Sequence, residues 1–232
     1  AQPALMASSM ALLAVFEAEG LAIDIFDYTA GHSLGEYSAL CAAKALSLSD
    51  AAKLLRQRGQ AMKSCIDASE GAMAAILGLT AQQVQRVLAN FSGPGICEVA
   101  NDNDPSQVVI SGHRQAVDAV INLVKKKGAR RAIPLNVSAP FHCKIMAPAA
   151  IIMKEALSEV KIEKPRVPIV MNTVAKSVSE PEIIRSLLVD QIVDRVRWRE
   201  TINFIFGLGP ATFYEVGVGK VLSGMVKRTV ND

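Results

Sequence analysis

The chain has 232 residues, of which 50% are hydrophobic and 20% are charged, and its formal net charge at pH 7 is +3. These values describe an ordinary globular protein with a full core, arranged as one large domain or two small ones. The charge is too weak to indicate nucleic-acid binding, and no apolar run reaches the roughly 18 residues of a membrane span. We therefore expect no nucleic-acid partner and no membrane insertion.

The first predicted element is a helix over residues 1–16, with Pro3 in its first turn and Gly20 as its stop. This apolar stretch lacks a basic start and a cleavage site, so we interpret it as a core helix and not as a signal peptide. The four cysteines are too sparse for a disulfide framework and lack the spacing of metal ligands. Reduced thiols, no metal site and a cytoplasmic location follow as expectations.

The next stretch resembles a nucleophile elbow. Residues 26–30 read as a short strand and residues 34–43 as a helix, and Gly31-His32-Ser33-Leu34-Gly35 joins them with the pattern G-x-S-x-G. A glycine-rich turn with a chance serine is the alternative, but the strand-then-helix context favours a nucleophilic serine. We expect both glycines to be required, because a side chain at either position would clash where strand and helix meet.

A second helix is predicted over residues 50–63, with Ser49 as its N-cap. Its apolar face consists of Ala51, Leu54, Leu55, Ala61 and Met62. Arg58 falls in the middle of that face, and a buried arginine keeps its charge and needs an anionic partner. The residues alone leave two partners open: an internal Asp or Glu, or a carboxylate on a substrate.

A smaller unit is predicted from residue 71 to residue 135. Its order is strand, helix, strand, strand, helix, strand, with strands at 73–79, 96–100, 108–111 and 131–135 and helices at 81–91 and 114–127. Glycine and proline mark turns at 93–95 and 104–106. This order is the split βαβ of a ferredoxin-like unit.

From residue 138 onward the pattern returns to alternation, with helices at 147–160, 180–188 and 198–208 and strands at 167–171 and 212–216. We predict an α/β fold in which residues 1–67 and 139–232 form an α/β-hydrolase-like core with a parallel sheet. Residues 68–138 would form an inserted ferredoxin-like subdomain, and a ligand cleft would lie between the two.

A serine nucleophile needs a general base, and the chain offers three histidines. His32 adjoins Ser33, and neighbours along a turn usually point apart. His113 follows a strand and opens a helix, where a role in the turn is the expected one. His142 lies where the chain re-enters the core, and this position favours it as the base.

Seven motifs carry a resemblance to a known family. GHSLGEYSAL at residues 31–40 is followed in order by QRGQAM at 57–62, GAMAAI at 71–76, NDN at 101–103, QVVISG at 107–112, SAPFH at 138–142 and EVGVGKVL at 215–222. In these motifs the chain resembles the malonyl-CoA:acyl carrier protein transacylases of fatty-acid synthesis and the acyltransferase domains of polyketide synthases. The motifs extend over nearly the whole chain.

The resemblance implies specific roles. Ser33 would be the nucleophile and His142, within Ser-x-Pro-x-His, its base. The main-chain carbonyl of Gln191 would orient the histidine, and Arg58 would hold the free carboxylate of malonate. The N–H of Leu34 would supply half of an oxyanion hole.

Four further residues are implied by the resemblance. Met62 and Phe141 would line the acyl pocket, and Asn101 and Asn103 would lie near the pantetheine arm. Each has a simpler interpretation: the first two could be core residues, and Asn-Asp-Asn-Asp-Pro at 101–105 favours a turn.

The resemblance also implies malonyl-CoA and an acyl carrier protein as partners, a two-step transfer without metal or redox cofactor, and a monomer. Members of the family carry a preceding segment with a first strand and a loop whose glutamine completes the oxyanion hole, so the sequence looks like a fragment. Two rival functions stay open. One is a serine hydrolase or thioesterase on a similar elbow, and the other is an inactive remnant.

Overall fold

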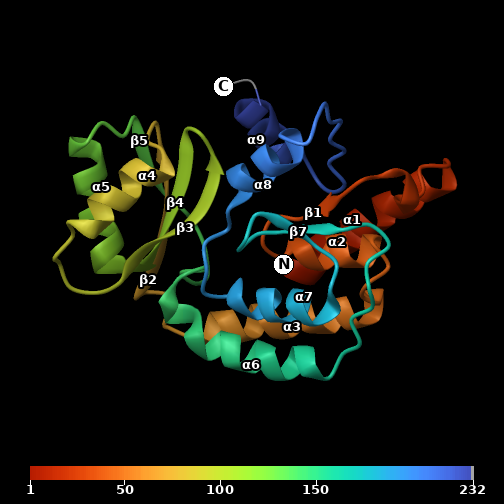
Figure 1. Ribbon diagram of the computed structural model, residues 1–232. Helices are drawn as coiled ribbons and strands as arrows, with labels where there is room; N and C mark the ends of the chain where they lie inside the picture. Colours follow the sequence, from red (N-terminus) through yellow and green to blue (C-terminus); the bar gives the residue numbers. More distant parts are fainter. Residues whose placement is uncertain (231–232) are drawn as a thin grey trace.

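The computed structural model describes residues 1–230 and shows a mixed α/β protein. A smaller part holds a four-stranded sheet with two helices, and a larger part holds a short three-stranded sheet among helices (Figure 1). Within the described residues, no helix combines the length and the apolar character needed to cross a membrane.

The larger part begins with α1 (Gln2–Ala18), η1 (Ile23–Ile25), β1 (Thr29–Ala30), α2 (Gly35–Ala42) and α3 (Leu48–Ser64). The strand predicted at 26–30 is shorter than expected, because only its last two residues pair with another strand. The predicted N-cap of α3 was wrong. Ser47 caps the helix by accepting a hydrogen bond from the Asp50 N–H at 3.0 Å, and Ser49 lies inside the first turn.

The smaller part contains β2 (Gly71–Leu77), α4 (Ala81–Ala89), β3 (Cys97–Asp104), β4 (Gln107–His113), α5 (Arg114–Lys126) and β5 (Arg131–Pro134), in the predicted order. Its strands pair antiparallel in the order β3-β4-β2-β5. The two helices cover one face of this sheet (Figure 1). The opposite face packs Met73, Ala75 and Val109 against Phe141, where the chain returns to the larger part.

Strand β3 extends four residues beyond its predicted end and includes Asn101 and Asn103, so the alternative interpretation of these two residues as a turn was wrong. The turn predicted at 104–106 is present at residues 105–106, between β3 and β4. Tertiary contacts outweigh the turn propensity of these residues. Asn101 forms an isolated parallel bridge with Val196, and the Asp102 N–H donates to the Val196 carbonyl at 2.9 Å. The tip of β3 is thereby joined to the larger part.

The larger part continues with η2 (Lys144–Met146), α6 (Ala147–Ser158), β6 (Ile169–Met171), β7 (Lys176–Val178), α7 (Pro181–Asp190), α8 (Trp198–Phe206) and α9 (Val221–Val230). Strand β6 pairs parallel with β1, as predicted for the core sheet. It also pairs antiparallel with β7, a strand that the sequence did not predict. The strand predicted at 212–216 was wrong, because these residues join no ladder and line a groove.

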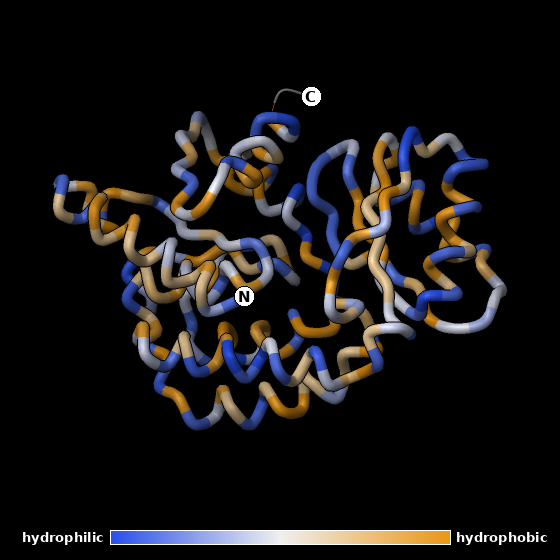
Figure 2. The backbone as a smooth tube through the Cα atoms, turned by 180° about the vertical axis from the view of Figure 1, so that it is seen from behind, coloured by the Kyte–Doolittle hydropathy of each residue, from blue (hydrophilic) through white to orange (hydrophobic). Residues whose placement is uncertain are grey.

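The main core lies among α2, α3, α6 and α7, where Leu40, Leu55, Met153 and Leu188 are fully buried. Hydrophobic and hydrophilic residues alternate along the two helices at the base of the molecule, α3 and α6 (Figure 2). In α6 one row of apolar residues, Ala149, Met153 and Leu157, is buried, whereas Ile151 is exposed. The buried row is the pattern that packs a helix on a core. This packing fixes α3, and with it Arg58, beneath the elbow.

Candidate active site

The elbow is a tight turn between β1 and α2, and Ser33 at its apex has a backbone φ of 55°. A Cβ atom on Gly31 would lie 2.0 Å from the carbonyl carbon of Gly35, so this glycine is required by close approach of the backbone. A Cβ atom on Gly35 would have no atom within 4 Å. The expectation that both glycines are required was therefore right for Gly31 and wrong for Gly35.

The serine hydroxyl faces a histidine. Ser33 Oγ lies 2.7 Å from His142 Nε2, and His142 Nδ1 lies 2.8 Å from the main-chain oxygen of Gln191. Because a carbonyl can only accept, Nδ1 carries the proton and Nε2 is left to accept one from the serine. The carbonyl of Gln191 thus occupies the position that a carboxylate holds in a serine–histidine–aspartate triad.

His142 is 4% exposed, and its backbone φ is 58°. Burial and, after it, the positive charge of Arg58 lower the pKa of its imidazole from 6.5 to about 3, against the opposing effect of the hydrogen bond to Gln191. The ring is therefore neutral at physiological pH, which is the state a general base needs.

Arg58 is 2% exposed, as the sequence predicted from its place on the apolar face of α3. Its Nη1 donates to Gln2 Oε1 at 2.7 Å, and its Nη2 donates to Gln191 Oε1 at 2.9 Å and to Ser33 Oγ at 3.1 Å. All three acceptors are neutral oxygens. Among residues 1–230 no ion pair includes Arg58, and its buried Nε has no hydrogen-bond partner.

A buried guanidinium without an anion is an unusual arrangement, since buried charges are normally paired. Of the two partners that the sequence left open for Arg58, the internal carboxylate is not within ion-pair distance in the described chain. The guanidinium therefore has no carboxylate in direct contact among the described residues, since the buried Glu36 acts on it only at longer range. A carboxylate on a bound molecule would pair with it directly.

Three residues of the site were missed by the sequence analysis: Gln2, Glu36 and Asn172. Asn172 Oδ1 accepts from the Ser33 N–H at 2.8 Å, and its Nδ2 donates to the Gly31 carbonyl at 2.8 Å. Glu36 is completely buried at the start of α2, and an acidic residue beside the elbow within an apolar helix is a signal that could have been used. Gln2 and Asn172 gave no such signal.

The elbow is also joined to the smaller part of the molecule. His32 Nε2 pairs with Asn103 Oδ1 at 2.8 Å, and its ring meets that of Trp198 edge-to-face at 5.6 Å. Burial lowers the pKa of His32. His113 lies elsewhere, at the end of β4, where its Nδ1 accepts from the Ile96 N–H at 2.9 Å.

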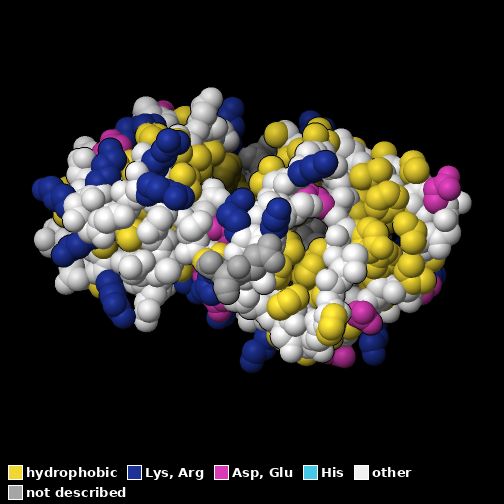
Figure 3. Space-filling view, turned by 90° about the horizontal axis from the view of Figure 1, so that it is seen from above, with side chains coloured by type: hydrophobic (Ala, Val, Ile, Leu, Met, Phe, Trp, Pro, Cys, Tyr) yellow, Lys and Arg dark blue, Asp and Glu magenta, His cyan; other side chains and the backbone are white. Residues whose placement is uncertain are grey.

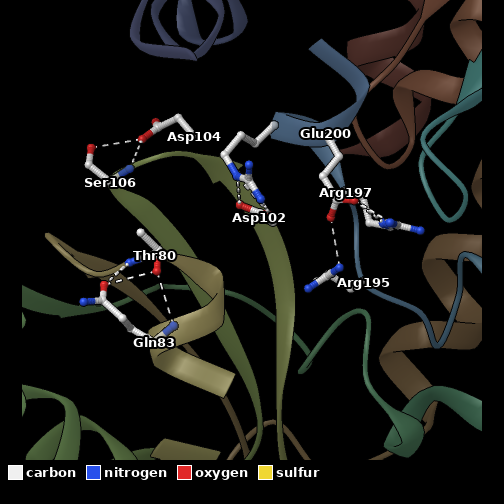
Figure 4. A network of polar contacts seen from close by, with 9 residues as sticks. Thr80, Gln83, Asp102, Asp104, Ser106, Arg195, Arg197 and Glu200 are labelled. Atoms are coloured by element: carbon white, nitrogen blue, oxygen red, sulfur yellow. Dashed lines mark hydrogen bonds and ion pairs between the residues drawn. The ribbon is translucent and has the colours of Figure 1, made fainter. Parts of the chain in front are cut away.

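Two ion pairs hold β3 against the C-terminal helices. Asp102, fully buried, accepts from Arg199 of α8 at 2.8 Å, and Asp104, also fully buried, accepts from Arg228 of α9 at 2.9 Å. Figure 4 shows Asp102 at the edge of β3 facing α8, with Glu200 on the same helix. These contacts fix the position of Asn103 and hence of His32.

The other predicted site residues make no side-chain hydrogen bond to Ser33 within the described chain. Leu34 is half-buried immediately before α2, and Met62 is fully buried one turn after Arg58 in the main core. Phe141 is half-buried between the main core and the sheet of the smaller part, and Asn101 is buried in β3. Their assignment to an oxyanion hole, an acyl pocket or the pantetheine arm stays a prediction.

A groove of about 1020 Å³ borders the elbow through His32, Leu34 and Gly35 but does not include Ser33 or His142. Its other walls come from α1, the segment from η1 to β1, α8, residues 208–218 and α9. Hydrophobic side chains gather on this half of the molecule, away from the four-stranded sheet (Figure 3). No group of His, Cys, Asp and Glu within residues 1–230 has the arrangement of a metal site.

The family model described as the acyl transferase domain matches residues 1–232. The chain belongs to this family. A malonyl CoA-acyl carrier protein transacylase of Bacillus subtilis (strain 168) is 46% identical over 229 residues, which are 98% of this chain and 71% of that protein.

Solved structures of acyl transferase family members agree with this assignment. An acyl-carrier-protein-S-malonyltransferase from Bartonella henselae is 49% identical, with a TM-score of 0.95 over 98% of this chain and 73% of that one. A malonyl-transacylase solved in complex with a type II PKS acyl-carrier protein is 39% identical, with a TM-score of 0.95 over 99% of this chain and 74% of that one.

Proposed function

We propose that the chain transfers a malonyl group from malonyl-CoA to the phosphopantetheine thiol of an acyl carrier protein through a malonyl ester on Ser33. The observation that carries this proposal is the buried guanidinium of Arg58, which has no carboxylate partner in the described residues and lies 3.1 Å from Ser33 Oγ. The names of the similar proteins support it, since all three are malonyl transacylases or malonyltransferases and one of them is bound to a carrier protein.

In the first half-reaction His142 Nε2 takes the proton of Ser33 as the oxygen attacks the thioester carbonyl. The tetrahedral oxyanion is stabilised by the N–H of Leu34, which precedes α2 and has no partner within that helix. The carbon–sulfur bond then breaks, and the imidazolium returns its proton to the departing CoA sulfur. Arg58 holds the malonyl carboxylate throughout, so the acyl carbon is presented to the serine in one orientation.

The second half-reaction reverses these roles. The carrier protein's thiol gives its proton to His142 and attacks the ester carbonyl, and Ser33 leaves with that proton as a free hydroxyl. All bonds formed and broken are acyl–oxygen and acyl–sulfur bonds. The proposed reaction therefore needs neither a metal nor a redox cofactor.

The finer description of the fold belongs to this proposal. We assign residues 1–67 and 139–232 to an α/β-hydrolase-like core and residues 68–138 to a ferredoxin-like insertion. The strand order β3-β4-β2-β5 with two helices on one face supports the insertion, and the turn between β1 and α2 supports the core. A monomer in the cytoplasm is part of the same proposal.

Intact-mass measurement tests the function. Incubation with malonyl-CoA should add one malonyl group to the protein, and subsequent addition of phosphopantetheinylated carrier protein should remove it and increase the mass of the carrier. If the adduct is lost to water at the same rate without carrier, the protein is a hydrolase. If no adduct forms and the carrier stays unmodified, the proposed function is wrong.

A further inference from the structure

Glu36 is the most deeply buried carboxyl group next to the site, and the proposed mechanism does not use it. It is 0% exposed and follows Ser33 by three residues, in the first turn of α2. One carboxylate oxygen accepts from the main-chain N–H of Asn172 at 2.5 Å, and the other accepts from Gln191 Nε2. Both oxygens therefore face hydrogen-bond donors, which the single oxygen of a glutamine could not match. Burial raises the pKa of this carboxyl group to about 8, against the lowering effect of these two hydrogen bonds and of Arg58.

The contact with Gln191 decides which way its amide faces. Gln191 Nε2 also donates to the main-chain oxygen of Ser33 at 2.9 Å, so two acceptors hold the amide nitrogen on this side. The amide oxygen is then left facing Arg58, from which it accepts at 2.9 Å. A reversed amide would place N–H groups against the guanidinium and an oxygen against the carboxylate.

The contact with Asn172 acts on the nucleophile. Asn172 follows β6 directly, and its side chain accepts from the Ser33 N–H and donates to the Gly31 carbonyl. By holding the main chain of Asn172, Glu36 fixes the residue that spans the elbow. Glu36 is thus joined to Ser33 through Asn172 and to Arg58 through Gln191.

We propose that Glu36 is a positioning residue for acyl-donor specificity, acting through the amide of Gln191 on the orientation of Arg58. This inference rests on the proposed malonyl transfer. Glu36 touches no reacting atom, and its effect should appear in the preference for a carboxylated acyl group more than in the chemistry common to all acyl groups.

The substitution Glu36→Gln separates the two contacts. Its single acceptor oxygen would stay with the Asn172 N–H, because a main-chain group cannot rotate away. The NH₂ group at position 36 would then face Gln191 Nε2. Two donors in contact repel, so the side-chain amide of Gln191 would favour the reversed orientation. The guanidinium would lose an acceptor and its fixed orientation, while the size of the side chain at position 36 would hardly change.

The experiment measures kcat/KM for acylation by malonyl-CoA and by acetyl-CoA. In Glu36→Gln the malonyl-to-acetyl ratio should fall roughly tenfold, the scale of one hydrogen bond to a charged group. In an Arg58→Ala background the same substitution should leave the ratio unchanged, because its effect passes through the arginine. Asp102→Asn, which alters a buried carboxylate outside this network, should lower stability without changing the ratio.

Glu36→Asp provides a second variant. It keeps two acceptor oxygens but cannot reach both donors, so we expect a smaller fall in the ratio. An unchanged ratio in either folded variant, or an equal fall in the Arg58→Ala background, would overturn the inference. A wild-type protein that transfers neither acyl group would instead refute the proposed function, so the two failures are distinguishable.

Discussion

The guanidinium of Arg58 lies 3.1 Å from the hydroxyl oxygen of Ser33, so one buried positive charge contacts the candidate nucleophile directly. A charge in this position has two consequences. It can hold a substrate carboxylate beside the serine, and it disfavours a second positive charge on the neighbouring His142. Each consequence leads to a prediction.

Arg58→Ala should reduce malonyl transfer far more than acetyl transfer. Charged hydrogen bonds are worth roughly 1.5–3 kcal/mol, which corresponds to about one to two decades in kcat/KM. The measurement is acylation by each CoA donor in parallel, with thermal unfolding as the control for folding. A similar loss for both donors would mean that the arginine supports the fold and does not select the substrate.

Ser33→Ala should form no covalent malonyl adduct, because the attacking oxygen is removed. The measurement is intact mass after mixing with malonyl-CoA. The matched control is Ser38→Ala, which removes a hydroxyl from the same helix that follows the elbow and should leave adduct formation intact. An adduct on Ser33→Ala at a comparable rate would place the nucleophile elsewhere.

His142→Ala should slow acylation by at least about a hundredfold, the usual scale for losing a general base. Rapid-mixing measurement of the acylation step gives this rate without the carrier protein. His113→Ala is the control, because His113 hydrogen-bonds the Ile96 N–H in the other sheet. An equal loss in a folded His113→Ala variant would contradict the assignment of the base.

The pH dependence of acylation should reflect the pKa of His142, which burial and Arg58 lower from 6.5 to about 3. The neutral base is lost only as the pH falls through the value in the folded protein, so activity should persist well below pH 6.5. In Arg58→Met the charge is gone, the pKa rises, and the acid limb should move to higher pH. Acetyl-CoA is the donor to use, since it has no carboxylate for the arginine.

The same shift predicts a stability effect with a definite sign. The folded state binds this proton less readily than the unfolded chain, so the free energy of unfolding should fall as the pH drops from 6.5 toward 3. His142→Asn should lessen that fall in urea unfolding. Two results together would contradict the lowered pKa of His142. They are an acid limb of acylation activity in Arg58→Met equal to that of the wild type, and a pH dependence of the free energy of unfolding in His142→Asn equal to that of the wild type.

The carrier protein should dock through the basic end of α5. Lys125, Lys126, Lys127, Arg130 and Arg131 are all exposed there, and acidic carrier proteins would be attracted to such a surface. Figure 3 shows many Lys and Arg side chains on the smaller part of the molecule, which contains α5. The alternative is a capped helix end, because Gly128 has a φ of 98° and the cations complement the helix dipole.

Reversing Lys126, Lys127 and Arg130 to Glu should raise the KM for carrier protein at low salt and leave acylation by malonyl-CoA unchanged. Lys220, Lys227 and Arg228 form a second basic group near the C-terminus. This group is a weaker candidate, since Arg228 is already paired with the buried Asp104. If the KM for carrier protein is the same in the triple variant as in the wild type, the basic residues only stabilise the end of α5 and are not a docking site.

Much of the site followed from sequence because its signals are local. Helical spacing alone placed Arg58 on the buried face of α3, and the strand–turn–helix context located the elbow. The pairing of Ser33 with His142 needed the family resemblance as well, since these residues are 109 positions apart. Gln2 and Asn172 could not be found, because contacts across such separations leave no periodic pattern in one sequence.

The errors in the fold have the same origin. Residues 212–216 have the composition of a strand. A strand forms only where a neighbouring strand pairs with it, and composition does not show whether such a neighbour is present. Asn101 and Asn103 favour a turn, yet β3 continues through them because Val196 and two arginines meet its outer edge. In both cases tertiary structure decided against local propensity.

Ser33 and His142 both stand at a φ near +55°, a region that glycine occupies freely and that other residues enter at a cost of about 1 kcal/mol or more. Glycine at either position would relieve the backbone and abolish the chemistry in the same substitution. Selection for stability and selection for activity therefore favour different residues at these two positions. A screen for thermal stability alone, without a test of activity, should therefore select glycine at these positions among its first substitutions.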